Sequence, residues 1–197
     1  MNLTLQTYTA SLQPEILLQM QTNYIIMDKF ILAESKEAYQ AAITLELFSK
    51  LIQEDLLEEQ NINYQVSPLE GVWHLLDNKI GFSEPNNIEG KMMIRQPFEL
   101  TEIKFGSLKA KALLLNEFKD LKESLLNIKF LIEPAQKVIQ ILHIGPYTNE
   151  KASFDEINSF ANKNDYHLKY EYHREIYLKD MRHTSKDKFE TILRVTI

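Results

Sequence analysis

One succession of predicted elements occurs twice in the sequence, and this repeat restricts the possible folds more than any other feature. From about residue 24 to residue 97, the hydrophobic pattern predicts a strand, a long helix and two further strands. The same succession is predicted from about residue 130 to residue 197. The last strands also agree in sequence, since MIR at residues 93–95 matches ILR at residues 192–194. Chance similarity between short strands is the alternative explanation.

The helix of the first copy has the clearest pattern. Ser35 is a typical N-cap, and apolar residues then recur at helical spacing to about residue 59. A shorter helix is predicted after Asn149. Strands are predicted over residues 24–32, 64–66, 69–76, 91–96, 127–132, 137–144, 172–178 and 191–197.

Two segments lie outside the repeated copies. Residues 1–22 are an N-terminal extension, in which Pro14 favours a short helix over residues 15–20. Residues 98–125 are a connector that is predicted to be helical from about Thr101. Residues 23–197 are therefore predicted to form a single domain with two half-repeats, at about residues 24–97 and 130–197.

Two β-α-β-β halves joined by a helical connector predict an α+β fold. The halves are expected to share one continuous antiparallel sheet, with both helices stacked on one face. The other face is then open. A groove between the pseudo-symmetric halves is the natural place for a ligand.

Charge argues against a nucleic-acid partner. Lys and Arg number 22 and Asp and Glu number 28, which gives a net charge of −6. An acidic protein has no broad basic face that could release counterions from a phosphate backbone. The longest apolar runs fall far short of the ~18 residues that span a bilayer. No basic residue precedes Lys29, so no secretion signal is indicated, and we expect a cytoplasmic protein without a membrane partner.

Residue types and motifs exclude further classes of chemistry. The chain has no cysteine, which removes disulfides, thiolate nucleophiles and cysteine-ligated metals. The five histidines show neither an HExxH motif nor a helical i,i+4 pair, so neither a metal site nor a cofactor is predicted. Phosphate-binding glycine motifs and GxSxG are also absent, and no protein partner is indicated.

Glu175 is the main candidate for chemistry. Alternation along residues 172–178 places His173, Glu175 and Tyr177 on one face, and Ile176 and Leu178 on the other. Because the apolar pair is expected to face the helices, Glu175 and Tyr177 are predicted to line the open face. A half-buried carboxylate there could act as a general base or bind a cation. The alternative is a solvated glutamate, or one paired with an arginine such as Arg95 or Arg194.

Trp73 is the single tryptophan and follows a glycine in the predicted strand. One interpretation is core packing. The other follows from the repeat, in which Trp73 and Tyr177 lie on matching strands and could form the two walls of one groove. Aromatic walls with carboxylates suit flat, apolar or cationic ligands. The turn Gly145-Pro146 would similarly hold Tyr147 in a fixed direction after His143.

Five segments in order and spacing resemble the GyrI-like small-molecule-binding domain family, in particular its stand-alone bacterial members. These segments are LEGVW (69–73), MIRQP (93–97), QILHIGPY (140–147), EIYL (175–178) with Asp180 and Arg182 behind it, and TILR (191–194). The resemblance covers about residues 24–197. It implies a pair of SHS2 modules that share a sheet and bind a drug-sized ligand between them.

The resemblance also implies a function. The expected protein binds hydrophobic, aromatic and cationic drug-like molecules in a central groove. The alternative is a hydrolase that opens cyclopropanoid-type xenobiotics, as some stand-alone relatives do, with Glu175 as the catalytic residue that orients water. Trp73 and Tyr147 would then hold or polarise the ligand. The predicted ligand-binding residues are Trp73, Tyr147, Tyr177, Glu70, His143 and His173.

Overall fold

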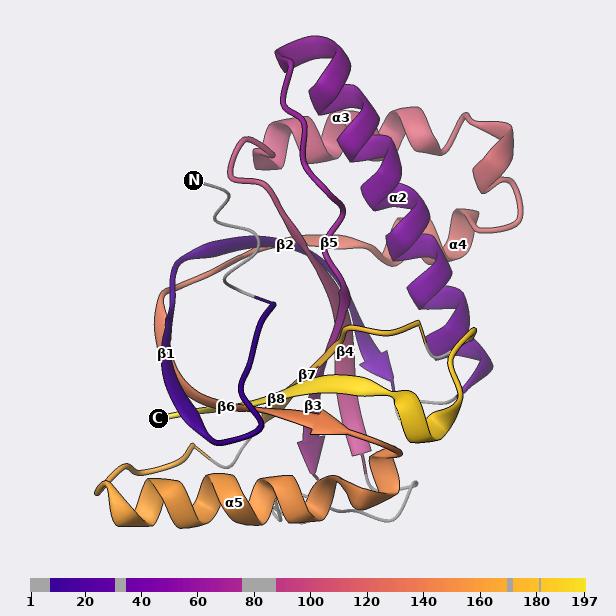
Figure 1. Ribbon diagram of the computed structural model, residues 1–197. Coiled ribbons are helices and arrows are strands. Elements are labelled where there is room, and N and C mark those ends of the chain that lie inside the picture. The colour runs from indigo at the N-terminus through magenta and orange to yellow at the C-terminus, as the bar shows by residue number, and fades with distance from the viewer. Residues whose placement is uncertain (1–7, 31–34, 76–87, 170–171, 181) are drawn as a thin grey trace.

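The computed structural model describes residues 8–30, 35–75, 88–169, 172–180 and 182–197 (Figure 1). Eight strands form one antiparallel sheet in the order β1-β6-β8-β7-β3-β4-β2-β5. The strands are β1 (Glu15–Gln19), β2 (Thr22–Phe30), β3 (Leu69–Leu75), β4 (Ile88–Gln96), β5 (Lys129–Glu133), β6 (Gln136–Ile144), β7 (His173–Tyr177) and β8 (Glu190–Thr196). The helices are α2 (Lys36–Gln60), α3 (Glu102–Ala112), α4 (Lys122–Asn127) and α5 (Glu150–Lys163), with short 3-10 turns η1 (Asn116–Phe118), η2 (Tyr147–Asn149) and η3 (Lys186–Lys188).

The sheet order confirms the predicted repeat. The first half runs β2-α2-β3-β4 and the second runs β6-α5-β7-β8. In each half the last strand lies between the other two, and the halves join where β3 pairs with β7. Equivalent strands therefore meet at the centre of the sheet, as a pseudo-twofold relation requires. The connector contributes α3, η1 and α4, which pack beside α2.

The sheet is strongly curled. Its two end strands, β1 and β5, come close enough for the Gln19 amide nitrogen to donate a hydrogen bond of 2.6 Å to the Glu133 carboxylate. Figure 1 shows α2 and α5 outside this curl. The sheet thus has an outer face, which the helices cover, and an inner face, which curves around the interior.

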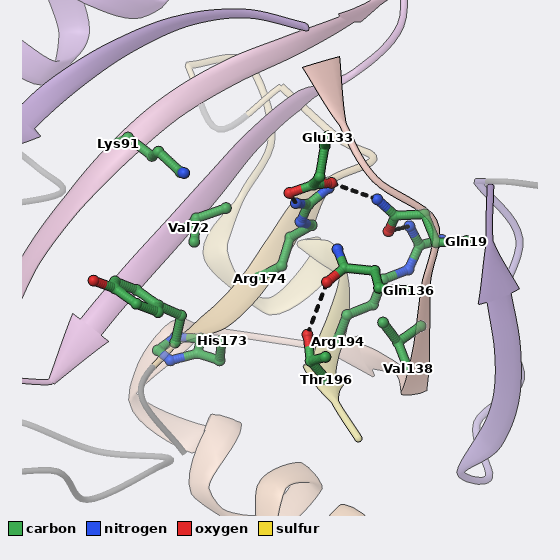
Figure 2. A pocket seen from close by; sticks show the side chains of 11 residues that line it. Gln19, Val72, Lys91, Glu133, Gln136, Val138, His173, Arg174, Arg194 and Thr196 are labelled. Carbon is green, nitrogen blue, oxygen red and sulfur yellow. Dashed lines mark hydrogen bonds and ion pairs between the residues drawn. The ribbon is translucent and has the colours of Figure 1, made fainter. Parts of the chain in front are cut away.

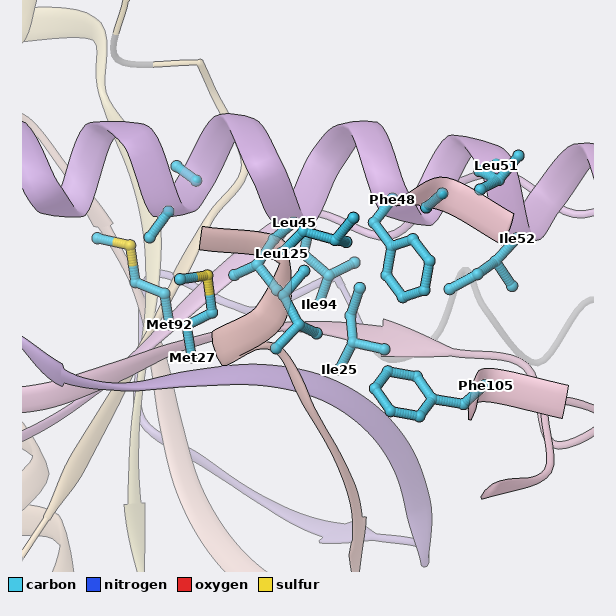
Figure 3. Packing of buried hydrophobic residues seen from close by; sticks show 14 of the residues in the cluster. Ile25, Met27, Leu45, Phe48, Leu51, Ile52, Met92, Ile94, Phe105 and Leu125 are labelled. Atoms are coloured by element: carbon cyan, nitrogen blue, oxygen red, sulfur yellow. The ribbon is translucent and has the colours of Figure 1, made fainter. Parts of the chain in front are cut away.

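Two apolar clusters fill the space between the helices and the outer face. The larger lies under α2, where the ring of Phe48 meets the edges of Phe105 and Phe118 at centroid distances of 5.8 and 6.5 Å (Figure 3). The smaller lies under α5 and includes Phe154 and Leu193. The predicted N-cap is confirmed, because the Ser35 hydroxyl accepts a 3.1 Å hydrogen bond from the backbone of Ala38. The helical periodicity of α2 therefore reflects a real apolar face.

The N-terminal segment crosses the inner face of the sheet. The backbone N–H of Leu142 donates to the carbonyl of Ser11 at 2.7 Å, and the Gln140 side chain donates to the carbonyl of Thr9 at 3.0 Å. This segment covers part of the inner face, so residues there are shielded from water. None of the helices in the described ranges combines the length and apolar character needed to cross a membrane.

Two predictions of local structure are wrong. Residues 15–20 do not form a helix, because Glu15–Gln19 is strand β1, paired antiparallel with β6. Residues 64–66 lie in a stretch without regular structure, between α2 and β3. Residues 31, 32 and 76, which the predicted strands included, lie outside the described residues.

Candidate functional site

The helices cover the face of β7 that carries His173, Glu175 and Tyr177, so the predicted orientation of Glu175 and Tyr177 is wrong. The ring of His173 packs against the ring of Phe154 on α5, with a distance of 4.9 Å between the ring centroids. His173 and Glu175 share one face of β7, so this contact places both residues on the outer face of the sheet. Ile176 lies on the inner face and is fully buried there. The prediction failed because the curled sheet buries both of its faces, and an apolar residue can then occupy either one.

Glu175 is held by its two neighbours on the same face of β7. The Tyr177 hydroxyl donates to one carboxylate oxygen at 2.8 Å, and His173 Nε2 lies 3.0 Å from the other. The Glu175 side chain is only 12 % exposed. Arg194 lies on the inner face, where it bonds Gln140. Glu175 is therefore neither solvated nor paired with Arg194.

Trp73 combines both interpretations of its role. Its side chain is 2 % exposed and belongs to the apolar cluster under α2. Its indole N–H nevertheless donates to the Tyr177 hydroxyl at 3.0 Å. The polar edge of this core residue therefore extends the chain of hydrogen bonds that ends at Glu175.

Two glycines in neighbouring strands make room for the indole. A Cβ at Gly71 would lie 2.7 Å from the Tyr177 hydroxyl, and one at Gly90 would lie 2.7 Å from Cζ3 of Trp73. Both distances are far inside van der Waals contact. The glycine that precedes Trp73 in the sequence is thus explained by close packing of this ring.

Tyr147 stands at the edge of the same cluster. It begins the turn η2 and meets the ring of Tyr177 edge-on at a centroid distance of 6.0 Å. Gly145 has a φ of 121°, a conformation that favours glycine, and its N–H bonds the carbonyl of Phe189 at 3.0 Å. The backbone before Tyr147 is therefore fixed, as the Gly-Pro sequence predicts.

His143 contacts this turn and the start of α5 through its two ring nitrogens. Its Nδ1 lies 3.0 Å from the hydroxyl of Ser153 on α5, and its Nε2 lies 3.2 Å from the carbonyl of Pro146. The ring is 5 % exposed. His143 thus connects the end of β6 with the first turns of α5.

Glu150 is a site residue that the sequence analysis missed. It is the first residue of α5, is 6 % exposed, and its Oε1 has no hydrogen-bond partner among the described residues. Burial, and next the negative charge of Glu175, raise the pKa of the Glu150 carboxyl well above its usual range. A glutamate in the first turn of a helix is common on exposed surfaces, so the sequence carried no signal of this environment.

We expect the variant Glu150→Gln to change how stability depends on pH. The raised pKa means that folded Glu150 keeps a proton which the unfolded chain releases above its usual pKa near 4.5. Below pH 4.5, Glu150 is protonated in both states and does not lower the free energy of unfolding. As the pH rises from there toward the pKa of Glu150 in the folded protein, the free energy of unfolding should fall by up to about 1.4 kcal/mol per pH unit. The glutamine variant lacks this loss. Urea unfolding of both proteins across this pH range measures the difference, and a pH-independent difference would contradict the assignment.

Glu70 lies on the opposite face from the other candidates. It is fully buried on the inner face, where its carboxylate accepts hydrogen bonds from Arg174 at 3.0 Å and from Tyr8 at 3.1 Å. The structure thus gathers Glu175, Tyr177, Trp73, Tyr147, His173 and His143 on the outer face and separates Glu70 from them. Within the described ranges, no group of three or more His, Cys, Asp or Glu side chains could hold a metal ion.

Comparison with known proteins agrees with this architecture. The sequence profile of the GyrI-like small molecule binding domain matches residues 44–196. An uncharacterized conserved protein from Listeria innocua is 23% identical, with a TM-score of 0.84 over 96% of this chain and 94% of that one. Two structures described as hydrolases from Listeria innocua, each 20% identical, give TM-scores of 0.78 and 0.74 over the same shares. No curated protein matches the sequence.

Proposed function

Since the chain belongs to the GyrI-like small-molecule-binding family, we propose that it binds hydrophobic aromatic compounds that carry a positive charge, at the cluster around Glu175. The observation that carries the proposal is a nearly buried carboxylate surrounded by aromatic rings. Tyr177 and His173 hold this carboxylate, and Tyr147 stands beside them.

The chemistry of this cluster favours cations over anions. Ring faces attract cations, and a carboxylate in a site of low dielectric adds a strong Coulomb attraction. Burial, and next the charge of Glu175, raise the pKa of the neighbouring Glu150 carboxyl well above its usual range, which favours the neutral form of Glu150. The arrangement therefore provides the Glu175 carboxylate and several rings for a flat or bulky aromatic cation.

Calorimetry with two ligands of equal shape and opposite charge tests this proposal. We expect tetraphenylphosphonium to bind at least about tenfold more tightly than tetraphenylborate, a difference of about 1.4 kcal/mol. Fluorescence of Trp73, the single tryptophan, gives a second readout because its indole bonds Tyr177. Equal affinity for the two ions, or no binding of either, would contradict the proposal.

Hydrolysis of a cyclopropanoid electrophile is the second candidate function. It is favoured by the fixed position of the Glu175 carboxylate, which could orient a water molecule and accept its proton. Two fold relatives are described as hydrolases. Incubation with a cyclopropanoid alkylator and mass spectrometry tests it. A product heavier by one water supports hydrolysis, and an unchanged compound that binds saturably leaves binding alone.

A further inference from the structure

The N-terminal segment places a tyrosine against a buried carboxylate on the inner face of the sheet. The Tyr8 hydroxyl donates to Oε1 of Glu70 at 3.1 Å, and Glu70 is fully buried. The buried side chain of Ser67 also hydrogen-bonds the Tyr8 phenol. The proposed function concerns the outer face and uses neither the Glu70 carboxylate nor this phenol.

The other oxygen of Glu70 is held by residues of the sheet itself. Its Oε2 accepts a hydrogen bond from Arg174 at 3.0 Å and lies 3.5 Å from the Tyr24 hydroxyl. Arg174 in turn donates to the Tyr24 hydroxyl at 2.8 Å and to Glu133 at 2.5 Å. All four residues belong to strands, so this group would stay in place without Tyr8. Glu70 Oε1 would then be a buried acceptor that lacks its donor, which is costly.

The segment that carries Tyr8 lies outside the sheet. Residues 9–14 belong to no helix or strand, and Figure 1 shows this segment, in indigo, crossing the opening of the curl before β1 begins. Its contacts with the sheet include the carbonyls of Ser11 and Thr9, which accept from the Leu142 backbone and the Gln140 side chain. Leu12 is 58% exposed. A segment with few buried contacts detaches at a lower cost in free energy than a strand does.

The surroundings of Glu70 suit an aromatic ring. Glu70 is the register partner of Met93, which belongs to a buried apolar cluster on the inner face. This cluster consists of Tyr24, Ile26, Val72 and Met93. Arg174 and Val72 also line a cavity of about 180 Å³ (Figure 2). An aromatic molecule that replaced Tyr8 would therefore find apolar side chains and free volume near the carboxylate.

We propose that Glu70 is the centre of a phenol-binding site on the inner face, and that Tyr8 is the intramolecular occupant of this site. A small phenol would enter when the segment of residues 8–14 detaches, and its hydroxyl would donate to Oε1 in place of Tyr8. A buried carboxylate selects a hydroxyl donor, because hydrogen bonds to a charged acceptor are stronger than neutral ones. A carboxylate ligand would instead place a second negative charge beside Glu70.

Hydrogen exchange of the native chain, measured by NMR, tests whether the segment is displaced. The Leu142 N–H bonds the Ser11 carbonyl, so its exchange rate reports whether the segment is attached. The ligand is p-cresol, which has the structure of the tyrosine side chain. We expect saturating p-cresol to accelerate exchange of the Leu142 amide at least about fivefold, because the segment that protects it is released.

A second amide serves as the control for this measurement. The Gly145 N–H bonds the carbonyl of Phe189, away from the N-terminal segment, and its exchange should change by less than about twofold. An unchanged rate at Leu142, or equal acceleration of both amides, would overturn the proposal.

Calorimetry with the variant Tyr8→Ala tests the preference for a hydroxyl. It should bind p-cresol at least about tenfold more tightly than the native chain, because the ligand no longer competes with a tethered phenol. Toluene has nearly the same shape without the hydroxyl, and should bind this variant at least about fivefold more weakly than p-cresol. Tyr8→Phe loses only the hydroxyl and should bind p-cresol about threefold more tightly than the native chain, which provides a test if Tyr8→Ala does not fold.

The matched control is Tyr39→Ala, which removes a tyrosine that is 40% exposed on α2 and should leave the affinity for p-cresol as in the native chain. Equal binding of toluene and p-cresol to Tyr8→Ala would overturn the proposal. The same affinity for p-cresol in the native chain and the Tyr8 variants would also overturn it, whatever the protein's affinity for tetraphenylphosphonium.

Discussion

The variant Glu175→Gln should bind tetraphenylphosphonium about thirtyfold more weakly than the native protein, a loss of about 2 kcal/mol. Glutamine keeps nearly the same shape and can still accept hydrogen bonds from Tyr177, but it removes the negative charge. Because the side chain is almost fully buried, water screens this charge poorly. Isothermal titration calorimetry at constant ionic strength measures the change.

A matched control separates the local effect from a change in net charge. Glu156 is an exposed glutamate on α5, so Glu156→Gln makes the same chemical change outside the cluster. Its affinity for tetraphenylphosphonium should stay within about twofold of native. An unchanged affinity in Glu175→Gln would show that the cation binds elsewhere.

The same variant distinguishes binding from hydrolysis if turnover of a cyclopropanoid compound is found. Glu175→Gln should then abolish turnover, while affinity for this uncharged compound stays within about tenfold, or roughly 1.4 kcal/mol. Loss of the rate without loss of binding is expected for a residue that acts on water in the transition state. Unchanged turnover would remove Glu175 from the mechanism.

The variant Glu70→Ala should lower the free energy of unfolding by about 3 kcal/mol. Glu70 is fully buried and bonds Arg174, Tyr8 and Tyr24 at 3.0, 3.1 and 3.5 Å. Its removal leaves part of the charge of Arg174 uncompensated in the interior. Glu133 still pairs with that arginine, so we do not expect the largest losses known for broken buried ion pairs.

Urea unfolding followed by circular dichroism measures this loss. Glu58→Ala is the control, because Glu58 is exposed near the end of α2, and it should change stability by less than about 0.5 kcal/mol. A loss below about 1 kcal/mol in Glu70→Ala would show that the inner ion pairs contribute little to stability.

The elements that the sequence predicted well are those whose signals are local. The N-cap Ser35 and the apolar periodicity behind it located α2, and the repeated pattern predicted the pairing of the two halves. In contrast, β1 becomes a strand through pairing with β6, more than a hundred residues away, for instance between Leu17 and Val138. Pro14 and short-range preferences could not show that partner.

The sequence indicated several members of the candidate site but not its orientation. The sequence pointed to Glu175, Tyr177 and Trp73, and the structure joins them by hydrogen bonds. Alternation shows which residues share a face, but it does not show which face the helices cover when both are buried. Glu150 could not be predicted because its burial depends on how α5 packs against the sheet.

The contact between β1 and β5 also bears on the tendency of this protein to aggregate at high concentration. An open sheet exposes unpaired backbone donors and acceptors at both margins, and other chains can add to them and aggregate. Here the ends of the two margins are bridged by Gln19 and Glu133, so a foreign strand that approaches this end of the sheet meets an amide and a carboxylate. We therefore expect the curl to hinder fibril-like self-association at this end of the sheet.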